Sequence, residues 1–336
     1  MNPEDRPLNQ ELKKKPFTRQ QIRDSFNKAA DGYDAAAIVQ QEVCQRLLER
    51  LEYIKAEPQM ILDIGSGTGQ GTLGLTKQYP DACIVSLDLA ENMLQKNRQK
   101  YREKTCHKNT LSGLAAQVKG LFNVTLNAAL NSKKAQNYQP VCADAQQLPF
   151  ADASVDLIFS NLTIQWCPEL TKLFYEFRRV LKPGGFLLFT TFGTKTLKEL
   201  RASWSEVSDK VHVNEFSDMH DIGDALYNVQ AENPVMDSEI ITLNYQSVKQ
   251  ILLDLKAVGA HNQNIGRQQA LTGKKRLQSM YQAYEQFRTQ DGYPVTYEVL
   301  YGHAWNPKTP MQRTQSVHQE QQTSISLAQL KSTLRS

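Results

Sequence analysis

Short apolar runs that end in glycine or polar residues recur along the chain, and segments with helical spacing separate them. We predict strands at residues 60–64, 84–89, 154–162 and 186–192, the third of them buried along its length, and the end of a further strand at 141–145. Apolar runs of this length, bounded by turn residues, are typical of strands that are covered on both faces. Strands that alternate with helices predict an α/β domain with a mostly parallel sheet.

Two further strands are expected near residues 240–245 and 295–303, after helices at 195–209 and 247–258. This last pair of strands predicts an antiparallel hairpin that closes a seven-stranded sheet. Its last strand therefore runs antiparallel to the others.

Helical spacing also predicts segments that lie outside the regular alternation. A helix from Thr18 and a second with Val39, Val43, Leu47 and Leu51 on one stripe are expected to form a lid. After a helix through Gln99, residues 100–139 are longer than a usual connection and predict a helical insertion. We expect residues 212–231 and 259–292 to cap the substrate side. The predicted organisation is a flexible arm at 1–17, one domain at 18–306 with its lid at 18–58, and a polar tail at 307–336.

Composition excludes several classes of protein. The 336 residues are 40% hydrophobic with a net charge of +4, and no run of about 18 apolar residues exists to span a membrane. The polar N-terminus lacks an apolar secretory core, so a cytoplasmic protein is expected. The five cysteines form no C-x-x-C pair, and neither a disulfide framework nor a metal site is predicted. No basic and aromatic platform indicates nucleic-acid binding.

The turn after the first strand carries the strongest chemical signal. Gly65, Gly67 and Gly69 allow a tight turn in which backbone amides approach a ligand closely. Asp63 stands before this turn, where a carboxylate repels a pyrophosphate but suits a cation. Asp88, about 20 residues beyond the turn, is positioned to bind two ribose hydroxyls. S-adenosylmethionine (SAM) combines a ribose with a cationic amino-acid end, so we predict a SAM site.

Later strand ends complete this predicted site. Asp144 follows the third strand and is expected to accept a hydrogen bond from the adenine amino group. Asn161 ends the fourth strand beside the expected sulfonium. A single Asp in such a place is commonly a helix cap or a turn residue, so the prediction depends on the ordered series. The predicted cofactor-binding residues are Asp63, Gly65, Ser66, Gly67, Gly69, Asp88, Leu89, Met93, Asp144, Ala145 and Asn161.

Several runs resemble one family of class I SAM-dependent methyltransferases, whose fold is Rossmann-like. The runs SFNKAA at 25–30, NLTIQWC at 161–167, FSDMHDIGDAL at 216–226 and TYEVLYGHAW at 296–305 resemble BioC, the malonyl-[acyl-carrier protein] O-methyltransferase family of biotin synthesis. The resemblance covers residues 18–306 and departs at the insertion and the polar tail. It implies methylation of the free carboxylate of malonyl-acyl-carrier protein, giving the methyl ester that primes pimeloyl synthesis.

This reaction requires no catalytic base, because a carboxylic acid with a pKa near about 4 is already ionised at neutral pH. Substrate-positioning residues are therefore the expected catalytic group. The candidates are Tyr33, Gln165, Trp166, Arg201 and Arg267. Arg267 is the first choice for the malonyl carboxylate, and Arg201 the second. A solvated arginine or a packed tryptophan are the alternatives for these residues.

The expected partner is an acidic acyl carrier protein, and residues 274–276 with Arg288 form a basic candidate docking site or an ordinary solvated helix face. The expected form is a monomer, although the sequence does not determine the oligomeric state. A coenzyme A-linked malonate remains an alternative substrate.

Two alternative functions also remain: a methyltransferase for a small molecule such as a quinone precursor, and a non-catalytic SAM-binding protein.

Overall fold

The fold centres on a single mixed sheet. The computed structural model describes residues 18–116, 137–260 and 273–308, and its seven strands have the order β3-β2-β1-β4-β5-β7-β6. β7 is antiparallel to both of its neighbours, β5 and β6, while the other pairs are parallel. The predicted seven-stranded sheet with an antiparallel last strand is therefore confirmed. The strands are β1 Met60–Ile64, β2 Cys83–Asp88, β3 Tyr138–Cys142, β4 Val155–Ser160, β5 Leu181–Phe192, β6 Glu232–Tyr245 and β7 Tyr293–Trp305.

The strand order changes direction at β1, which pairs with β2 on one side and with β4 on the other. Asp63 near the end of β1 lies in register with Ser86 on β2 and Phe159 on β4. In open α/β sheets, ligands bind beyond the carboxyl ends of the strands at such a switch point. The topology therefore brings the predicted strand-end residues to one edge of the sheet.

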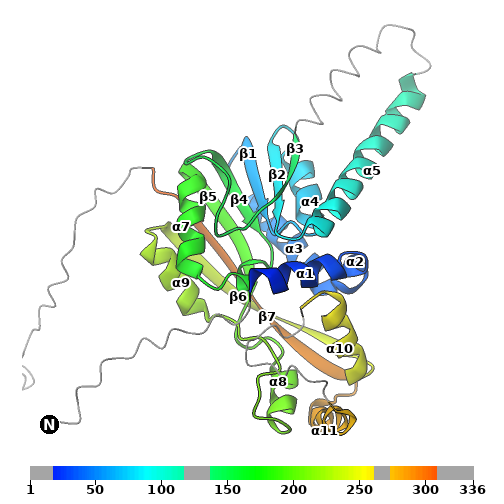
Figure 1. The fold of residues 1–336 in the computed structure, drawn as a ribbon. Coiled ribbons are helices and arrows are strands. Elements are labelled where there is room, and N and C mark those ends of the chain that lie inside the picture. The colour runs from blue at the N-terminus through cyan, green and yellow to red at the C-terminus, as the bar shows by residue number, and fades with distance from the viewer. Residues whose placement is uncertain (1–17, 117–136, 261–272, 309–336) are drawn as a thin grey trace, which may run out of the picture.

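Helices cover both faces of the sheet. The helices are α1 Arg19–Ala29, α2 Tyr33–Ala36, α3 Ile38–Arg50, α4 Gln70–Gln78, α5 Glu91–Ala116, α7 Leu170–Val180, α8 Lys198–Ser205, α9 Met219–Asn228, α10 Val248–Ala257 and α11 Lys274–Tyr284. Apolar residues of α3, α4, α8, α10 and α11 share a core with one face, which includes Ile61. Those of α7 and α9, which lie side by side in Figure 1, share a core with the opposite face, which includes Leu62. Alternate residues of β1 thus serve two cores.

The N-terminal helices differ in how they cover the sheet edge. Thr18 caps α1 in a capping box with Gln21, which fixes the start of the helix. In contrast to a simple lid, α3 buries Val43 and Leu47 completely in the main core beside α4. Burial of each such side chain contributes about 1.5–3 kcal/mol. The segment that covers the strand ends is therefore α1 and α2, with the first turns of α3.

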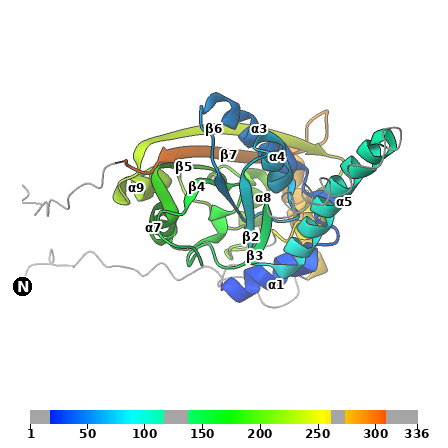
Figure 2. The same ribbon diagram turned by 90° about the horizontal axis from the view of Figure 1, so that it is seen from above.

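Helix α5 is longer than the sequence pattern predicted. The predicted end at Gln99 is wrong, because the helix continues to Ala116. Residues 95–104 consist mainly of Gln, Lys, Arg and Glu, which favour helix, and nothing there interrupts it. The second half of α5 extends away from the sheet in both views (Figures 1 and 2). The rest of the predicted insertion, 117–136, lies outside the described residues.

The two segments predicted to cap the substrate side are only partly found there. Helix α9 packs against α7 on the other face of the sheet, because its buried Ile222 and Leu226 join that core. Helix α11 packs against α8 and α10 through Met280 and Tyr284. Among the described residues, no helix has the length and apolar character to cross a membrane.

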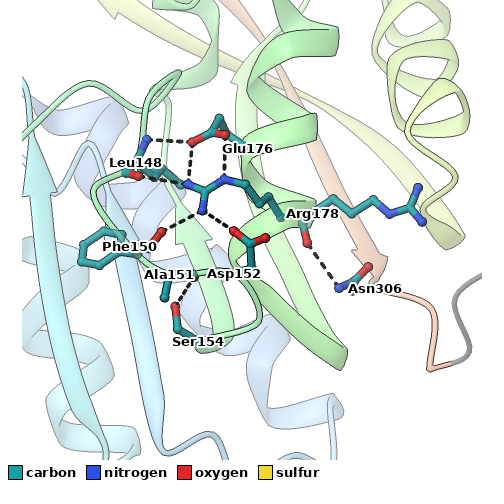
Figure 3. A network of polar contacts seen from close by, with 9 residues as sticks. Leu148, Phe150, Ala151, Asp152, Ser154, Glu176, Arg178 and Asn306 are labelled. Atoms are coloured by element: carbon teal, nitrogen blue, oxygen red, sulfur yellow. Dashed lines mark hydrogen bonds and ion pairs between the residues drawn. The ribbon is translucent and has the colours of Figure 1, made fainter.

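A polar network holds the connection between β3 and β4 (Figure 3). The guanidinium of Arg179 on α7 donates hydrogen bonds to the carbonyls of Leu148 and Phe150, at 3.0 and 2.8 Å, and forms an ion pair with Glu176. Glu176 also accepts a hydrogen bond from the Leu148 amide, and Arg179 lowers the pKa of this carboxyl group. The network fixes the turn that follows Asp144.

Candidate functional site

A cavity of about 100 Å³ lies at the carboxyl ends of β1, β2, β3 and β4, and we call it the strand-end cavity. Helix α1 covers it with Ile22 and Phe26. The sequence-predicted residues that line it are Tyr33, Gly65, Gly67, Asp88, Leu89, Met93, Asp144, Ala145, Asn161 and Trp166. Most of the predicted cofactor-binding residues therefore meet around one cavity.

A smaller side pocket of about 50 Å³ continues from this cavity past the glycine turn. It contains two carboxylates, Asp34 and Asp63, and it shares Tyr33 and Asn161 with the strand-end cavity. Ser66 also lines it. The side pocket is therefore suited to the cationic end of a ligand whose remainder lies in the strand-end cavity.

Gly65 and Gly69 are required by the shape of the turn. Gly65 has φ of +67°, and a Cβ atom there would lie 2.0 Å from Oγ1 of Thr163. Gly69 has φ of +95° and caps α4, and its Cβ would lie 2.5 Å from Oδ1 of Asn97. Both positions exclude other residues through backbone conformation and close packing. Gly69 lines neither cavity, so its contribution is to the turn.

The two acids at the ends of β1 and β2 are held differently. Asp88 accepts hydrogen bonds from the amides of Gly67 and Ala90, at 2.9 and 2.8 Å, which tie the glycine turn to β2. Asp63 is 2% exposed and accepts a hydrogen bond of 2.6 Å from the Thr72 hydroxyl. No lysine or arginine among the described residues pairs with Asp63.

Burial raises the pKa of both carboxyl groups. The pKa of Asp63 rises to about 7, against the opposing effect of the Thr72 hydrogen bond. The pKa of Asp88 rises to about 6, because burial outweighs its backbone hydrogen bonds. Two carboxylates that are costly to ionise favour a cationic ligand, since its charge offsets that cost.

Asp144 and Asn161 already have protein partners. Asp144 forms an ion pair of 2.7 Å with Arg19 of α1 and accepts a hydrogen bond from the Gln146 amide. Asn161 donates to the carbonyl of Gln40 and accepts from the Thr190 hydroxyl, at 3.0 and 2.8 Å. Asn161 therefore joins β4, α3 and β5 at the wall of the strand-end cavity.

A larger cavity, the apolar chamber, lies beyond Trp166 and has a volume of about 370 Å³. Trp166 lines both this chamber and the strand-end cavity, and Gln40 lines both the chamber and the side pocket. The aromatic residues of the chamber are Trp166, Phe192, Trp204, Phe216, Tyr245 and Tyr297. Among its described lining residues, the carboxylate is Asp254 and the ammonium group is Lys256. The chamber thus suits a mainly apolar substrate next to a polar cleft.

Comparisons with known proteins agree on the class of protein. Two models, each described as a methyltransferase domain, match residues 61–123 and 106–189. A malonyl-[acyl-carrier protein] O-methyltransferase of Gallionella capsiferriformans is 45% identical over 87% of this chain and 92% of its own length. The chain belongs to this family. Enzymes of the same name from Nitrosospira multiformis and Legionella pneumophila are 44% and 39% identical, over 86% and 85% of this chain and 89% and 90% of their own lengths.

The YcgJ protein of Bacillus subtilis has a similar fold, with a TM-score of 0.51 and 16% identity over 79% of this chain and all of its own. The sheet order and these comparisons together establish the Rossmann-like class I methyltransferase fold. Both the predicted family and the predicted fold class are confirmed.

The predicted substrate residues are distributed unevenly over the three cavities. Trp166 and Gln165 line the apolar chamber. Trp166 makes an edge-on contact with Phe26 of α1, and Gln165 donates to the Leu162 carbonyl and accepts from Thr191. Tyr33 lines the cofactor side instead.

Arg201 is not among the residues that line the chamber. Its guanidinium donates to the carbonyls of Thr194 and Thr196, at 2.9 and 3.1 Å, and so supports the loop between β5 and α8. This placement does not support its expected contact with the substrate, because those donors serve backbone carbonyls. Arg267, the first choice for the malonyl carboxylate, lies outside the described residues.

Sequence reasoning missed several residues that shape the site. Arg19 reaches Asp144 from α1, Thr163 packs against Gly65, and the fully buried Asn97 donates to Ser66 and Thr72. For Asn97 one feature could have indicated its role: it is an amide side chain on the side of α5 that faces the glycine turn. Arg19 gave none, because an arginine in the first turn of a helix is usually solvated.

Proposed function

We propose that this chain transfers the methyl group of SAM to the free carboxylate of a malonyl group carried on acyl carrier protein. The observation that carries the proposal is the junction at Trp166 and Gln40, where the two acid-lined cavities meet the apolar chamber. A methyl donor and an acyl acceptor bound on the two sides of this junction would face one another. The family assignment supports malonyl-acyl-carrier protein as the acceptor.

SAM fits the cavities by its chemistry. Its α-ammonium and sulfonium suit the carboxylates of the side pocket, and its adenosine suits the strand-end cavity with Asp88 and Asp144. Asp88 is assigned to the ribose hydroxyls, and Asp144 to the adenine amino group. Asp144 would keep its ion pair with Arg19 through one oxygen, and the adenine amino group would share the other oxygen with the Gln146 amide.

The transfer needs no proton acceptor. A malonyl carboxylate is ionised at neutral pH, so an oxygen lone pair attacks the sulfonium methyl and the carbon–sulfur bond breaks as the ester bond forms. The products are the methyl ester and neutral S-adenosylhomocysteine. Alignment of the reacting atoms at about 3 Å contributes up to roughly 7–11 kcal/mol.

The apolar walls of the chamber support the same reaction. Opposite charges cancel as the methyl moves, so exclusion of water favours the transition state over two separately hydrated ions. A strong ion pair with the substrate carboxylate would stabilise the ground state instead. A single ammonium group, Lys256, among the described charged lining residues is consistent with that balance. Arg267 stays a second candidate for this role.

The carrier protein is expected to dock on a basic surface, which we call the α11 face. It consists of residues 274–276 and Arg288, all exposed. Arg288 contacts Glu285 at 3.7 Å and lies over the Tyr293 ring, and the Glu285 carboxylate offsets part of its charge. Such a surface raises the rate of encounter with an acidic partner.

The test is a transfer assay with labelled SAM and malonyl-, acetyl- and succinyl-carrier protein. We expect a base-labile methyl ester on malonyl-carrier protein and no product from acetyl-carrier protein, which lacks a free carboxylate. Malonyl-coenzyme A in a parallel reaction measures the preference for the carrier. Binding of SAM without transfer to malonyl-carrier protein would contradict the proposal and favour a non-catalytic protein.

A further inference from the structure

His212 presents a buried polar atom without a partner to the apolar chamber. It lines the chamber, and its Nε2 atom is buried and has no hydrogen-bond partner. Its ring stacks on that of Trp204 from α8, with centroids 3.9 Å apart and an interplanar angle of 6°. The stacking fixes the imidazole plane. A buried nitrogen that lacks a partner costs stability, so such a group commonly marks a ligand site.

His212 lies outside the two cofactor cavities. Trp166 and Gln40 mark the side of the chamber that adjoins the cofactor cavities, whereas His212 and Trp204 line neither of those cavities. The chamber of about 370 Å³ greatly exceeds the roughly 10–15 Å³ that one water molecule requires, and a three-carbon malonyl group fills only a part of it. The chamber therefore has room for more of the substrate than its acyl group.

A carrier protein presents its acyl group as a thioester at the end of a long arm that contains amide groups. An amide offers both a donor and an acceptor, either of which suits a neutral imidazole nitrogen. Burial, with Arg276 and Lys210 nearby, lowers the pKa of His212, which favours the neutral ring. The described wall of the chamber also carries one acidic and one basic side chain, Asp254 and Lys256.

We propose that His212 is a positioning residue whose Nε2 atom hydrogen-bonds an amide of the arm that joins the malonyl thioester to its carrier. The inference rests on the proposed function and adds a specificity determinant to it. His212 anchors the arm at a part of the chamber wall that lies outside the two cofactor cavities, and so raises the affinity for carrier-linked malonate.

The test compares His212→Ala, His212→Gln and His220→Ala in the full chain. His220 is exposed on α9 and provides the matched control. Loss of one neutral hydrogen bond predicts a KM for malonyl-carrier protein about tenfold higher in His212→Ala, which corresponds to about 1.4 kcal/mol. The kcat and the affinity for SAM stay nearly unchanged. His212→Gln recovers most of the loss, because its amide reaches a similar position.

A second substrate separates binding of the arm from binding of the acyl group. S-ethyl malonyl thioester keeps the malonyl group but lacks the amides, so the KM of wild type and His212→Ala for it should be equal. An equal loss on both substrates, or an unchanged KM for malonyl-carrier protein, overturns the inference. Absence of transfer by wild-type protein that binds SAM contradicts the proposed function and removes the basis of the inference.

Discussion

At the scale of single residues, the cofactor side is dominated by carboxylates that are buried before any ligand binds. Asp63 is nearly inaccessible, and its closest hydroxyl partner, Thr72, is itself fully buried. Ionised Asp63 lacks a cationic partner among the described residues. A sulfonium and an ammonium group would supply the missing charge, so the binding of SAM and the ionisation of Asp63 are linked.

This linkage predicts the pH dependence of SAM binding. The pKa of Asp63 is raised to about 7, so protons compete with SAM below that pH. We expect the Kd for SAM to rise by up to about tenfold for each pH unit below about 7 and to level off above it. Calorimetry between pH 6 and 8.5 measures this slope. A Kd that is constant over the range would contradict the assignment of Asp63.

Asp63→Asn provides the control. SAM binding by this variant should be weaker at pH 8 and should vary less with pH. In the ligand-free protein the raised pKa has the opposite consequence. Its contribution to stability is present below the unfolded pKa of about 4 and is lost as the pH rises through about 7. Ligand-free Asp63→Asn should therefore unfold at the same temperature as wild type, or at a higher one, at pH 8.

At the scale of elements, α1, α2 and the turn between them, which cover the strand ends, are attached to one face of α5 by polar contacts. The contacts recur every four residues of α5 and are Asn92 with Asn27, Lys96 with Asp31 at 2.7 Å, and Lys100 with Asp34 at 2.5 Å. Asp34 also accepts a hydrogen bond of 2.6 Å from Thr68 in the glycine turn. The apolar cluster beneath is small and includes Ala29, Ala30, Ala90 and Met93.

Ion pairs between exposed side chains are screened by water and contribute little to stability, so the segment is held over the cofactor cavities by a modest free energy. We predict that Lys96→Ala with Lys100→Ala raises the dissociation rate of SAM by about three- to tenfold, and that high salt has a similar effect on wild type. Stopped-flow displacement of SAM measures the rate. Lys104→Ala, one turn further along α5, is the matched control. If the double variant released SAM at the wild-type rate, these contacts would have no part in retaining it.

At the scale of the whole molecule, residues 274–276 of the α11 face lie on the helix that packs against α8, and residues of α8 line the apolar chamber. We predict that Lys274→Glu with Lys275→Glu raises the KM for malonyl-carrier protein at least several-fold, and that this difference shrinks as salt increases. S-ethyl malonyl thioester should be used equally well by both proteins, because it needs no docking surface.

Lys55→Glu with Lys77→Glu makes the same change of net charge at exposed positions elsewhere. Initial rates against carrier concentration at two ionic strengths compare the two variants. Equal losses in both would mean that overall charge, rather than the α11 face, governs the encounter with the carrier.

Much of the fold followed from local pattern. β1, β2 and β4 are short apolar strands close to their predicted bounds, and the positive φ angles of the glycine turn require the glycines that the sequence shows. β5 and β6 begin earlier than predicted, at Leu181 and Glu232, because pairing with neighbouring strands extends them through polar residues. Asp88 and Asp144 were found because topology brings successive strand ends to one edge. The end of α5 was missed because its strong helix formers continue past the point where the α/β alternation suggested a turn.

The sequence by itself determined the order of strands and helices, the glycine turn and the acids at the strand ends, because these depend on neighbours along the chain. Only the tertiary structure decided which donors are already satisfied. It assigned Arg201 to backbone carbonyls, Arg19 to Asp144, and left Nε2 of His212 without a partner inside the chamber. Those outcomes depend on contacts between distant segments, since a polar side chain pairs with whatever the fold brings within about 3 Å.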